Sequence, residues 1–188
     1  MTTLRGRHVT LRPLTPHDAE VTQGWRTGGR AQLLNRGAQT VAEQQAWIEG
    51  RPATEYNFVM MLDTGDLVGM YSLIDVDMHH RRAVAAHFLI GEPELVAPYG
   101  AGVIAAEATQ LLYRLAFDEL KLHRLDGTVS GDNVGMIRYD QYLGWQVEGR
   151  LRDHYFLNSH YQDAVCVGLL EADYRTVTIA RLRGLARG

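Results

Sequence analysis

Two glycines stand one residue apart in the segment PYGAGV, directly before a long alanine-rich stretch with helical periodicity. The N-terminus of a helix exposes unpaired backbone N–H groups and the positive end of the helix dipole, so it attracts anions. Glycine opens the backbone to a phosphate because it has no side chain. The spacing predicts either an anion site or a plain helix start at five consecutive amides: Tyr99, Gly100, Ala101, Gly102 and Val103.

A histidine and an aspartate are candidates for moving a proton. His87 lies in the apolar segment AVAAHFLIG, where strand alternation predicts that it shares a face with Ala85. An unperturbed imidazole, with a pKa of about 6.5, accepts a proton near neutral pH; a hydrogen-bonded core histidine is the alternative. Asp140 is expected on the helix face that carries Asn133 and Met136, either in a site or in solvent.

Strands and helices that follow one another along the chain must position these residues. Alternating apolar residues predict strands, and apolar residues three or four apart predict helices. The expected elements, in order, are a strand over 6–14, helices over 16–25 and 41–49, strands over 56–62, 67–77 and 83–91, a loop over 92–102, a helix of four or five turns, a strand over 122–130, a helix over 133–143, strands over 145–157 and 161–170, and a helix from 173. This order predicts one α/β (α+β) domain over 1–188, with a mixed central sheet of about seven strands and helices on both faces.

Composition argues against several other classes of protein. A formal net charge of -3 and the lack of a basic stripe disfavour a nucleic-acid binder. No apolar run reaches the roughly 20 residues that span a bilayer, so no membrane association is expected. The only cysteine, Cys166, cannot form an internal disulfide, which is typical of a cytoplasmic protein. His79 and His80 are adjacent without a cysteine or acidic cluster, so we expect no metal.

Over nearly its whole length the chain resembles the GNAT superfamily of acyl-CoA N-acyltransferases, most closely the RimJ/RimL-like branch. The opening VTLRPLTPHDAEVTQGW is similar to the first strand and helix of that branch, and APYGAGVIAAEA is similar to its pyrophosphate loop. The closing segment is the most specific part, because several residues fall in order at the spacing of the family: Asn133, Leu143-Gly144-Trp145, Glu148-Gly149, Arg152 and Asp163.

The resemblance implies acetyl-CoA as co-substrate, with its pyrophosphate at the amides of the 99–103 loop. It implies that four residues contact the pantetheine arm, three of them through the backbone of a strand edge: Phe88, Leu89, Ile90 and Asn133. Arg138 is expected either at an adenosine phosphate or solvated on an exposed helix face.

The resemblance fails at the residues that usually move protons. Many relatives carry a glutamate as general base where this chain has Ala85, and a tyrosine as general acid where it has Asp140. We expect His87 to replace the glutamate and Asp140 to orient His87 or the amine. Tyr139 and Tyr142 are candidates for the acid if the helix register shifts by one residue.

The sequence thus predicts an N-acetyltransferase that moves an acetyl group from acetyl-CoA to a primary amine by direct attack. A transferase for another acyl group is an alternative, and so is a non-catalytic acyl-CoA-binding protein of the same fold. The acceptor is expected to be a small molecule, such as an amino sugar, or a peptide N-terminus. No acidic or basic cluster specifies its charge. A homodimer through the closing strands is one option for the assembly.

Overall fold

A mixed sheet runs through the structure, a computed structural model that describes residues 2–34, 37–100 and 102–186. Its eight strands lie in the order β1-β2-β3-β4-β5-β6-β8-β7. The strands are β1 (Leu4–Arg5), β2 (Val9–Pro13), β3 (Tyr56–Leu62), β4 (Leu67–Asp77), β5 (Arg82–Ile90), β6 (Arg124–Ser130), β7 (Gln146–Leu157) and β8 (His160–Leu170). The expected mixed sheet is confirmed, and the two-residue strand β1 brings it to eight strands.

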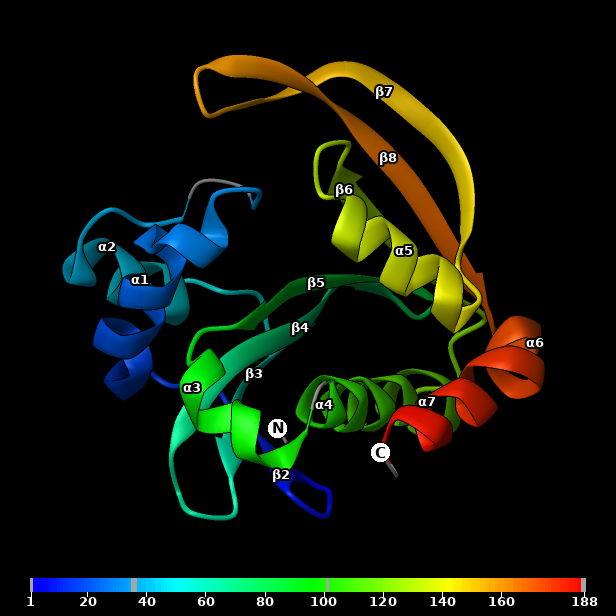
Figure 1. Ribbon diagram of the computed structural model, residues 1–188, viewed down its shortest axis with the longest axis horizontal. Coiled ribbons are helices and arrows are strands. Elements are labelled where there is room, and N and C mark those ends of the chain that lie inside the picture. The colour runs from blue at the N-terminus through cyan, green and yellow to red at the C-terminus, as the bar shows by residue number, and fades with distance from the viewer. Residues whose placement is uncertain (1, 35–36, 101, 187–188) are drawn as a thin grey trace.

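Helices cover both faces of the sheet, as expected. They are α1 (Ala19–Thr27), α2 (Val41–Glu49), α3 (Pro93–Val96), α4 (Val103–Arg114), α5 (Val134–Leu143), α6 (Glu171–Asp173) and α7 (Ile179–Leu185). A π-helical turn extends α4 to Glu119. Helices α1 and α2 lie together on one side, whereas α4 and α7 pack side by side on the other (Figure 1). The expected loop over 92–102 is partly helical, because Pro93 starts the short helix α3 and a 3-10 turn follows it.

Local capping residues define the ends of two helices, α2 and α5. Thr40 caps α2, since its side chain accepts a hydrogen bond from the Glu43 amide at 3.1 Å. Asn133 caps α5, and Gly144 ends that helix in the left-handed conformation with φ of 99°. These caps fix the direction in which α5 presents its side chains.

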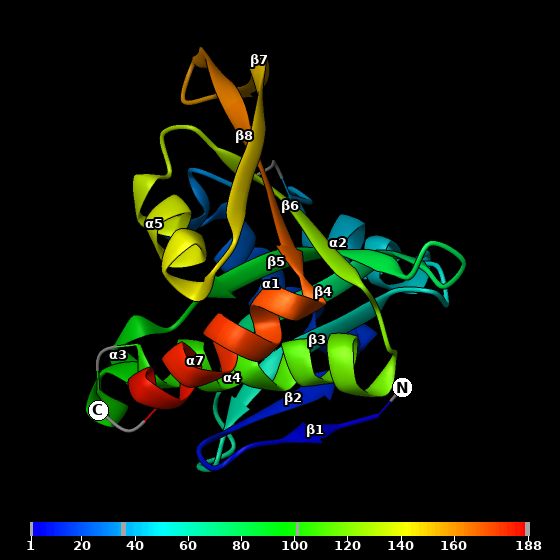
Figure 2. The same cartoon turned by 90° about the vertical axis from the view of Figure 1, so that its right-hand side faces the viewer.

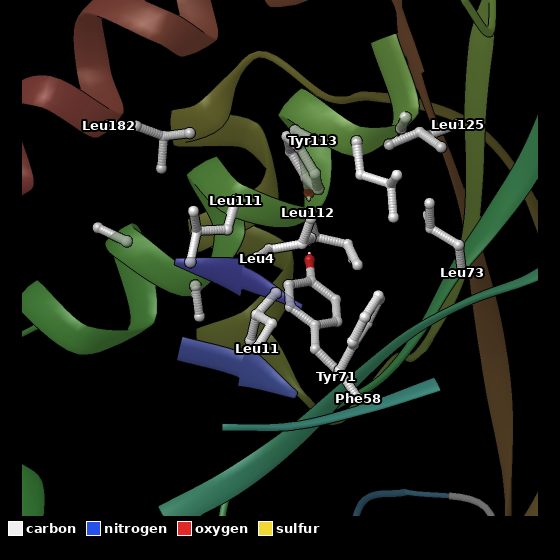
Figure 3. Close-up of a cluster of buried hydrophobic side chains, with 14 of the residues drawn as sticks. Leu4, Leu11, Phe58, Tyr71, Leu73, Leu111, Leu112, Tyr113, Leu125 and Leu182 are labelled. Atoms are coloured by element: carbon white, nitrogen blue, oxygen red, sulfur yellow. Dashed lines mark hydrogen bonds between the residues drawn. The ribbon is translucent and has the colours of Figure 1, made fainter. Parts of the chain in front are cut away.

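The main core lies between the sheet and α4, and it includes the buried side chains in Figure 3. Leu112 and Phe117 are completely buried there against strand residues such as Leu11 and Phe58. Burying one such side chain stabilises the fold by about 2 kcal/mol. Smaller clusters fill the opposite face beneath α1 and α2. The sheet is therefore buried on both faces, and this keeps α4 and α1 in fixed positions on opposite sides of β5.

The sheet opens between β5 and β6, the one parallel pair among the described strands. Only residues 82–84 of β5 pair with residues 124–126 of β6, although β5 continues to Ile90 and β6 to Ser130. Figure 2 shows the β7–β8 hairpin extending away from the first half of the sheet. The residues after Val84 consequently have a free backbone edge toward β6.

No single helix among the described residues is long and apolar enough to cross a membrane. One bent pair, residues 93–99 with 103–119, has the required length and composition.

Candidate active site

A cavity of about 230 Å³ lies where β5 and β6 separate. Residues 84–88 of β5 and 127–130 of β6 line it, so it occupies the opening in the sheet. Side chains from both faces of the sheet also reach it. The arrangement joins the α4 side of the sheet to the α1 side through one space.

Two groups of residues face each other across this cavity. The α1 wall, as we name it, consists of Arg26, Leu33, Leu34 and His87. The α5 wall consists of Asn133, Met136, Asp140 and Tyr113. Each wall contains one of the residues that the sequence singles out for proton transfer, His87 or Asp140.

His87 does not share the face of Ala85, so that prediction is wrong. The pairing of β4 with β5 is irregular between Met70 and Ser72, and His87 adopts φ of 57° at this bulge. A bulge inserts one residue and breaks the alternation of side chains. The ring of His87 therefore points toward α2, where it lies 5.4 Å from Trp47 and 3.1 Å from the Ser72 hydroxyl, whereas Ala85 packs in the core beneath α4.

The imidazole of His87 also differs from the expected proton acceptor. Burial, together with the positive charges of Arg26 and Arg51, lowers the pKa of this imidazole to about 4. An imidazole with this pKa is neutral at pH 7, and it holds a proton too weakly to be an efficient general base.

Asp140 lies on the inner face of α5 together with Asn133 and Met136, as predicted. Asp140 is only 4% exposed, and burial raises the pKa of its carboxyl group to about 7. The carboxyl group makes no hydrogen bond to any side chain in the described part of the chain. A carboxyl group with this pKa is close to half-protonated at neutral pH, which suits a group that exchanges protons.

Three buried aromatic residues form a hydrogen-bonded chain beside Asp140. The Trp145 indole donates to the Tyr113 hydroxyl at 3.0 Å. The Tyr71 hydroxyl donates to the same oxygen at 3.5 Å (Figure 3). All three line the cavity. These two hydrogen bonds hold the hydroxyl group of Tyr113 in the α5 wall.

The glycine loop before α4 adopts the conformation that glycine permits. Gly100 has φ of 101° and Gly102 has φ of 80°, both in the left-handed range. The amides of Gly100 and Val103 are already bonded, to Ala97 and Gly100 carbonyls respectively.

The Tyr99 hydroxyl donates to Asp63 at 2.6 Å, and Ala101 lies outside the described residues. The amides of Gly102 and Ile104 have no backbone partner among the described residues, so the unpaired amides begin at Gly102, within the predicted loop, and extend to Ile104.

The strand edge expected to contact pantetheine is open toward β6. Phe88 lines the cavity, while the side chain of Leu89 is buried beneath α1. The carbonyl of Ile90 accepts a hydrogen bond from Arg30 at 2.8 Å, so this one group is already occupied. The available edge therefore lies at residues 85–89 and excludes the carbonyl of Ile90.

The remaining predicted residues on α5 have separate environments. Asn133 lines the cavity, with its side-chain oxygen capping α5 by accepting from Met136. Arg138 is exposed. Tyr139 packs against Phe88 and Thr109, and burial raises its pKa to about 12. Tyr142 is 45% exposed beneath Arg181. Neither tyrosine lines the cavity, because the helix turns both away from it.

The sequence did not identify Arg26, Tyr71 or Tyr113 as site residues. Arg26 lies in the last turn of α1, where basic residues are common, so its position carries no special signal. The two tyrosines lie in apolar segments that predict ordinary core packing. Only the fold brings these three residues to one cavity. The part of the chain that the structure describes contains no group of three or more His, Cys, Asp or Glu suited to a metal ion.

Comparison with known proteins agrees with this geometry. Residues 8–146 match the acetyltransferase (GNAT) domain. The chain is 28% identical over 183 residues to the probable N-acetyltransferase YjcK of Bacillus subtilis, a match that covers 90% of this chain and 98% of that protein. It is 30% identical over 121 residues to a spermidine N(1)-acetyltransferase of Escherichia coli, covering 64% and 61% of the two chains.

A solved structure shares the fold. The spermidine N-acetyltransferase from Vibrio cholerae in complex with CoA and spermine superposes with a TM-score of 0.78 at 23% identity, covering 89% of this chain and 98% of that one. The matched domain includes β2 to α5, and therefore both the glycine loop and Asp140. The chain belongs to the GNAT family of acetyltransferases.

Proposed function

We propose that this acetyl-CoA-dependent N-acetyltransferase acetylates the primary amine of a small molecule by direct attack on the thioester. The observation that carries the proposal is the cavity between β5 and β6, which joins the two sides of the sheet and has the Asp140 carboxyl group in its wall. Such a space lets the cofactor approach from one side and the amine from the other. Holding both in one geometry supplies much of the rate in a reaction of this kind.

The residues around the cavity fit acetyl-CoA. The start of α4 offers unpaired amides to the pyrophosphate, and a Cβ added at Gly102 would meet no atom within 4 Å. The open edge of β5 offers backbone groups to the amides of pantetheine, as a strand edge does to an added strand. We assign the thioester to the opening in the sheet, between the α1 wall and the α5 wall.

Asp140 is our candidate for the general acid. Attack forms the bond between the nitrogen and the acetyl carbon and breaks the bond between that carbon and sulfur. The sulfur takes the proton of the Asp140 carboxyl group, and the proton lost by the nitrogen restores the acid. His87, neutral at pH 7, orients the amine by a hydrogen bond instead of removing its proton.

A small acceptor is supported by the enclosed site and by the spermidine acetyltransferases among the relatives. A peptide N-terminus is the other acceptor class that the sequence leaves open. We also propose that residues 1–188 act as one domain in the cytoplasm, on the basis of the single cysteine. A homodimer would be detected by light scattering at micromolar concentration.

The proposal is tested by calorimetry of acetyl-CoA binding with a matched pair of variants, Gly102→Asp and Gly102→Asn. Both side chains tolerate a left-handed backbone better than other residues do, and they have nearly the same shape. Only aspartate adds a negative charge beside the proposed pyrophosphate. Two unit charges about 4 Å apart near a protein surface interact by roughly 4 kcal/mol, so we expect Gly102→Asp to bind at least about tenfold more weakly than Gly102→Asn.

Equal affinity of the two variants would contradict the assignment of the pyrophosphate to this loop. A second assay follows CoA thiol release with a panel of amines. Binding of acetyl-CoA without release for any amine would favour the non-catalytic alternative.

A further inference from the structure

The hydroxyl group of Tyr113 is a buried polar group in the α5 wall that has no role in the reaction as described so far. Tyr113 lies near the C-terminal end of α4 and is only 1% exposed, yet it lines the cavity between β5 and β6. Buried donors and acceptors are paired as a rule, because an unmet one costs free energy. The bonds of this hydroxyl group therefore indicate what else it can bind.

The oxygen of Tyr113 already accepts two hydrogen bonds. The Trp145 indole can only donate, and it does so at 3.0 Å. The Tyr71 hydroxyl donates to the same oxygen at 3.5 Å. A tyrosine hydroxyl has one proton of its own, and the proton of Tyr113 has no acceptor among the residues that the structure describes. One donor consequently remains for a group that enters the cavity.

Neighbouring rings hold this donor in a fixed orientation. The rings of Phe117 and Tyr174 contact that of Tyr113 edge to face, with centroids 6.4 and 6.5 Å away. Trp145 packs against the same ring at 6.1 Å, and all three neighbours are buried. Figure 3 shows Tyr113 and Tyr71 meeting at their hydroxyl groups from α4 and β4. A donor that is fixed before the substrates bind needs no reorganisation during the reaction.

The environment keeps the hydroxyl group protonated. Burial, followed by the negative charges that Tyr71 and Asp140 can carry, raises the pKa of Tyr113 well above its ordinary value. Tyr113 therefore donates a hydrogen bond at neutral pH but does not give up its proton. Asp140, on the same wall, has a pKa of about 7 and suits proton transfer to sulfur. A donor that does not ionise suits the remaining atom of the thioester, its carbonyl oxygen.

We infer that Tyr113 is a catalytic residue that donates a hydrogen bond to the carbonyl oxygen of the thioester. The inference rests on the proposed acetyltransferase function and adds a residue to its mechanism. Attack of the amine forms the bond between nitrogen and carbon, and an electron pair of the C=O bond moves onto oxygen. The Tyr113 hydroxyl group stabilises the negative charge that develops there. As the C=O bond forms again, the bond between carbon and sulfur breaks, and sulfur takes the proton of Asp140.

Tyr113→Phe removes the hydroxyl group and keeps the ring. We expect kcat for CoA thiol release, measured with the best acceptor of an amine panel, to fall by about 10²- to 10³-fold, the usual loss for one donor to an oxyanion. The KM for acetyl-CoA should change little, because the bond is strongest in the transition state. The decline in activity above about pH 7 should persist, since it belongs to Asp140.

Tyr174→Phe is the matched control. It deletes the hydroxyl group of another buried tyrosine, which packs against the Tyr113 ring but does not line the cavity. The hydroxyl group of Tyr174 donates to Asp118 at 3.4 Å, away from the α5 wall. We expect the kcat of Tyr174→Phe to equal that of the wild type.

Infrared spectroscopy provides a readout that a purely structural role would not change. The probe is acetyl-CoA with a ¹³C-labelled carbonyl group, bound in the absence of an amine. A hydrogen bond to a carbonyl oxygen lowers its stretching frequency, so the band should lie lower in the wild type and in Tyr174→Phe than in Tyr113→Phe.

Thermal melting shows whether each variant folds, because Tyr113→Phe also deprives Trp145 and Tyr71 of their acceptor. If Tyr113→Phe does not fold, Trp145→Phe takes its place. It removes the donor that holds the Tyr113 oxygen, so kcat should fall by about 2- to 10-fold and the carbonyl band should move to higher frequency.

The outcomes separate the inference from the proposed function. A loss of kcat below about fivefold in a folded Tyr113→Phe, or a carbonyl band at the wild-type frequency, would overturn the role of Tyr113 and leave acetyl transfer intact. An equal loss in Tyr174→Phe would overturn it as well, because the effect would then come from core packing. If only Trp145→Phe folds, wild-type values of both kcat and the band would contradict the inference. No release of CoA by the wild type with any amine would overturn both proposals.

Discussion

The two walls of the cavity each bury one titratable group, and the same physical effect leads to opposite chemistry. Burial penalises the charged form of either group, so it raises the pKa of Asp140 to about 7 and lowers the pKa of His87 to about 4. The carboxyl group is thereby brought to the pH at which it exchanges protons readily. The imidazole is moved away from that pH. Proton transfer is therefore expected at the α5 wall and acceptor recognition at the α1 wall.

The largest expected effect, and the strongest test of this difference between the walls, is the loss of the proposed general acid Asp140. Asp140→Asn keeps the shape of the side chain but cannot donate a carboxylic proton, and general acids contribute about 10²- to 10⁴-fold. We expect kcat/KM to fall by that factor and the decline of wild-type activity above about pH 7 to disappear. Asp66→Asn, an equal change in the exposed β3–β4 turn, should have no effect. A loss of less than about threefold in Asp140→Asn would remove Asp140 from the mechanism.

The substitution Asp140→Asn should also change how the free energy of unfolding depends on pH. In the folded protein Asp140 binds its proton more tightly than in the unfolded chain, so its favourable contribution is complete below about pH 4 and is lost as pH rises through about 7. Asparagine does not ionise. The stability of Asp140→Asn relative to wild type should therefore increase by about 2 to 3 kcal/mol between pH 5 and pH 8, as measured by urea unfolding. An unchanged difference would mean that the carboxyl group is solvated.

The smallest effect concerns His87. If the neutral imidazole only orients the amine, His87→Ala should reduce kcat/KM by about 2- to 10-fold, the usual worth of one neutral hydrogen bond. The activity of the wild type should not rise with pH around a midpoint near 6.5. A rise of that kind that is absent from His87→Ala would instead indicate a histidine base. A loss above about 100-fold together with such a rise would restore His87 as the general base and reverse the comparison between the two walls.

The sequence by itself determined the features that depend on near neighbours along the chain. The helices predicted over 41–49 and 133–143 match α2 and α5, because the caps that bound them, Thr40 and Gly144, are set by bonds within a few residues. The spacing of apolar residues likewise determined the strands and the mixed sheet. Helical spacing likewise placed Asp140 on the face of α5 that carries Asn133 and Met136.

Only the tertiary structure decided what surrounds these residues. The bulge in β5 depends on pairing with β4, and it turned His87 to the face opposite the one that alternation predicts. The pKa values of His87 and Asp140 depend on water excluded by distant segments, which no local pattern encodes. Arg26 and Tyr113 reach one cavity from helices on opposite sides of the sheet. The cavity that these residues line arises from packing between distant parts of the chain, so it could be found only in the folded protein.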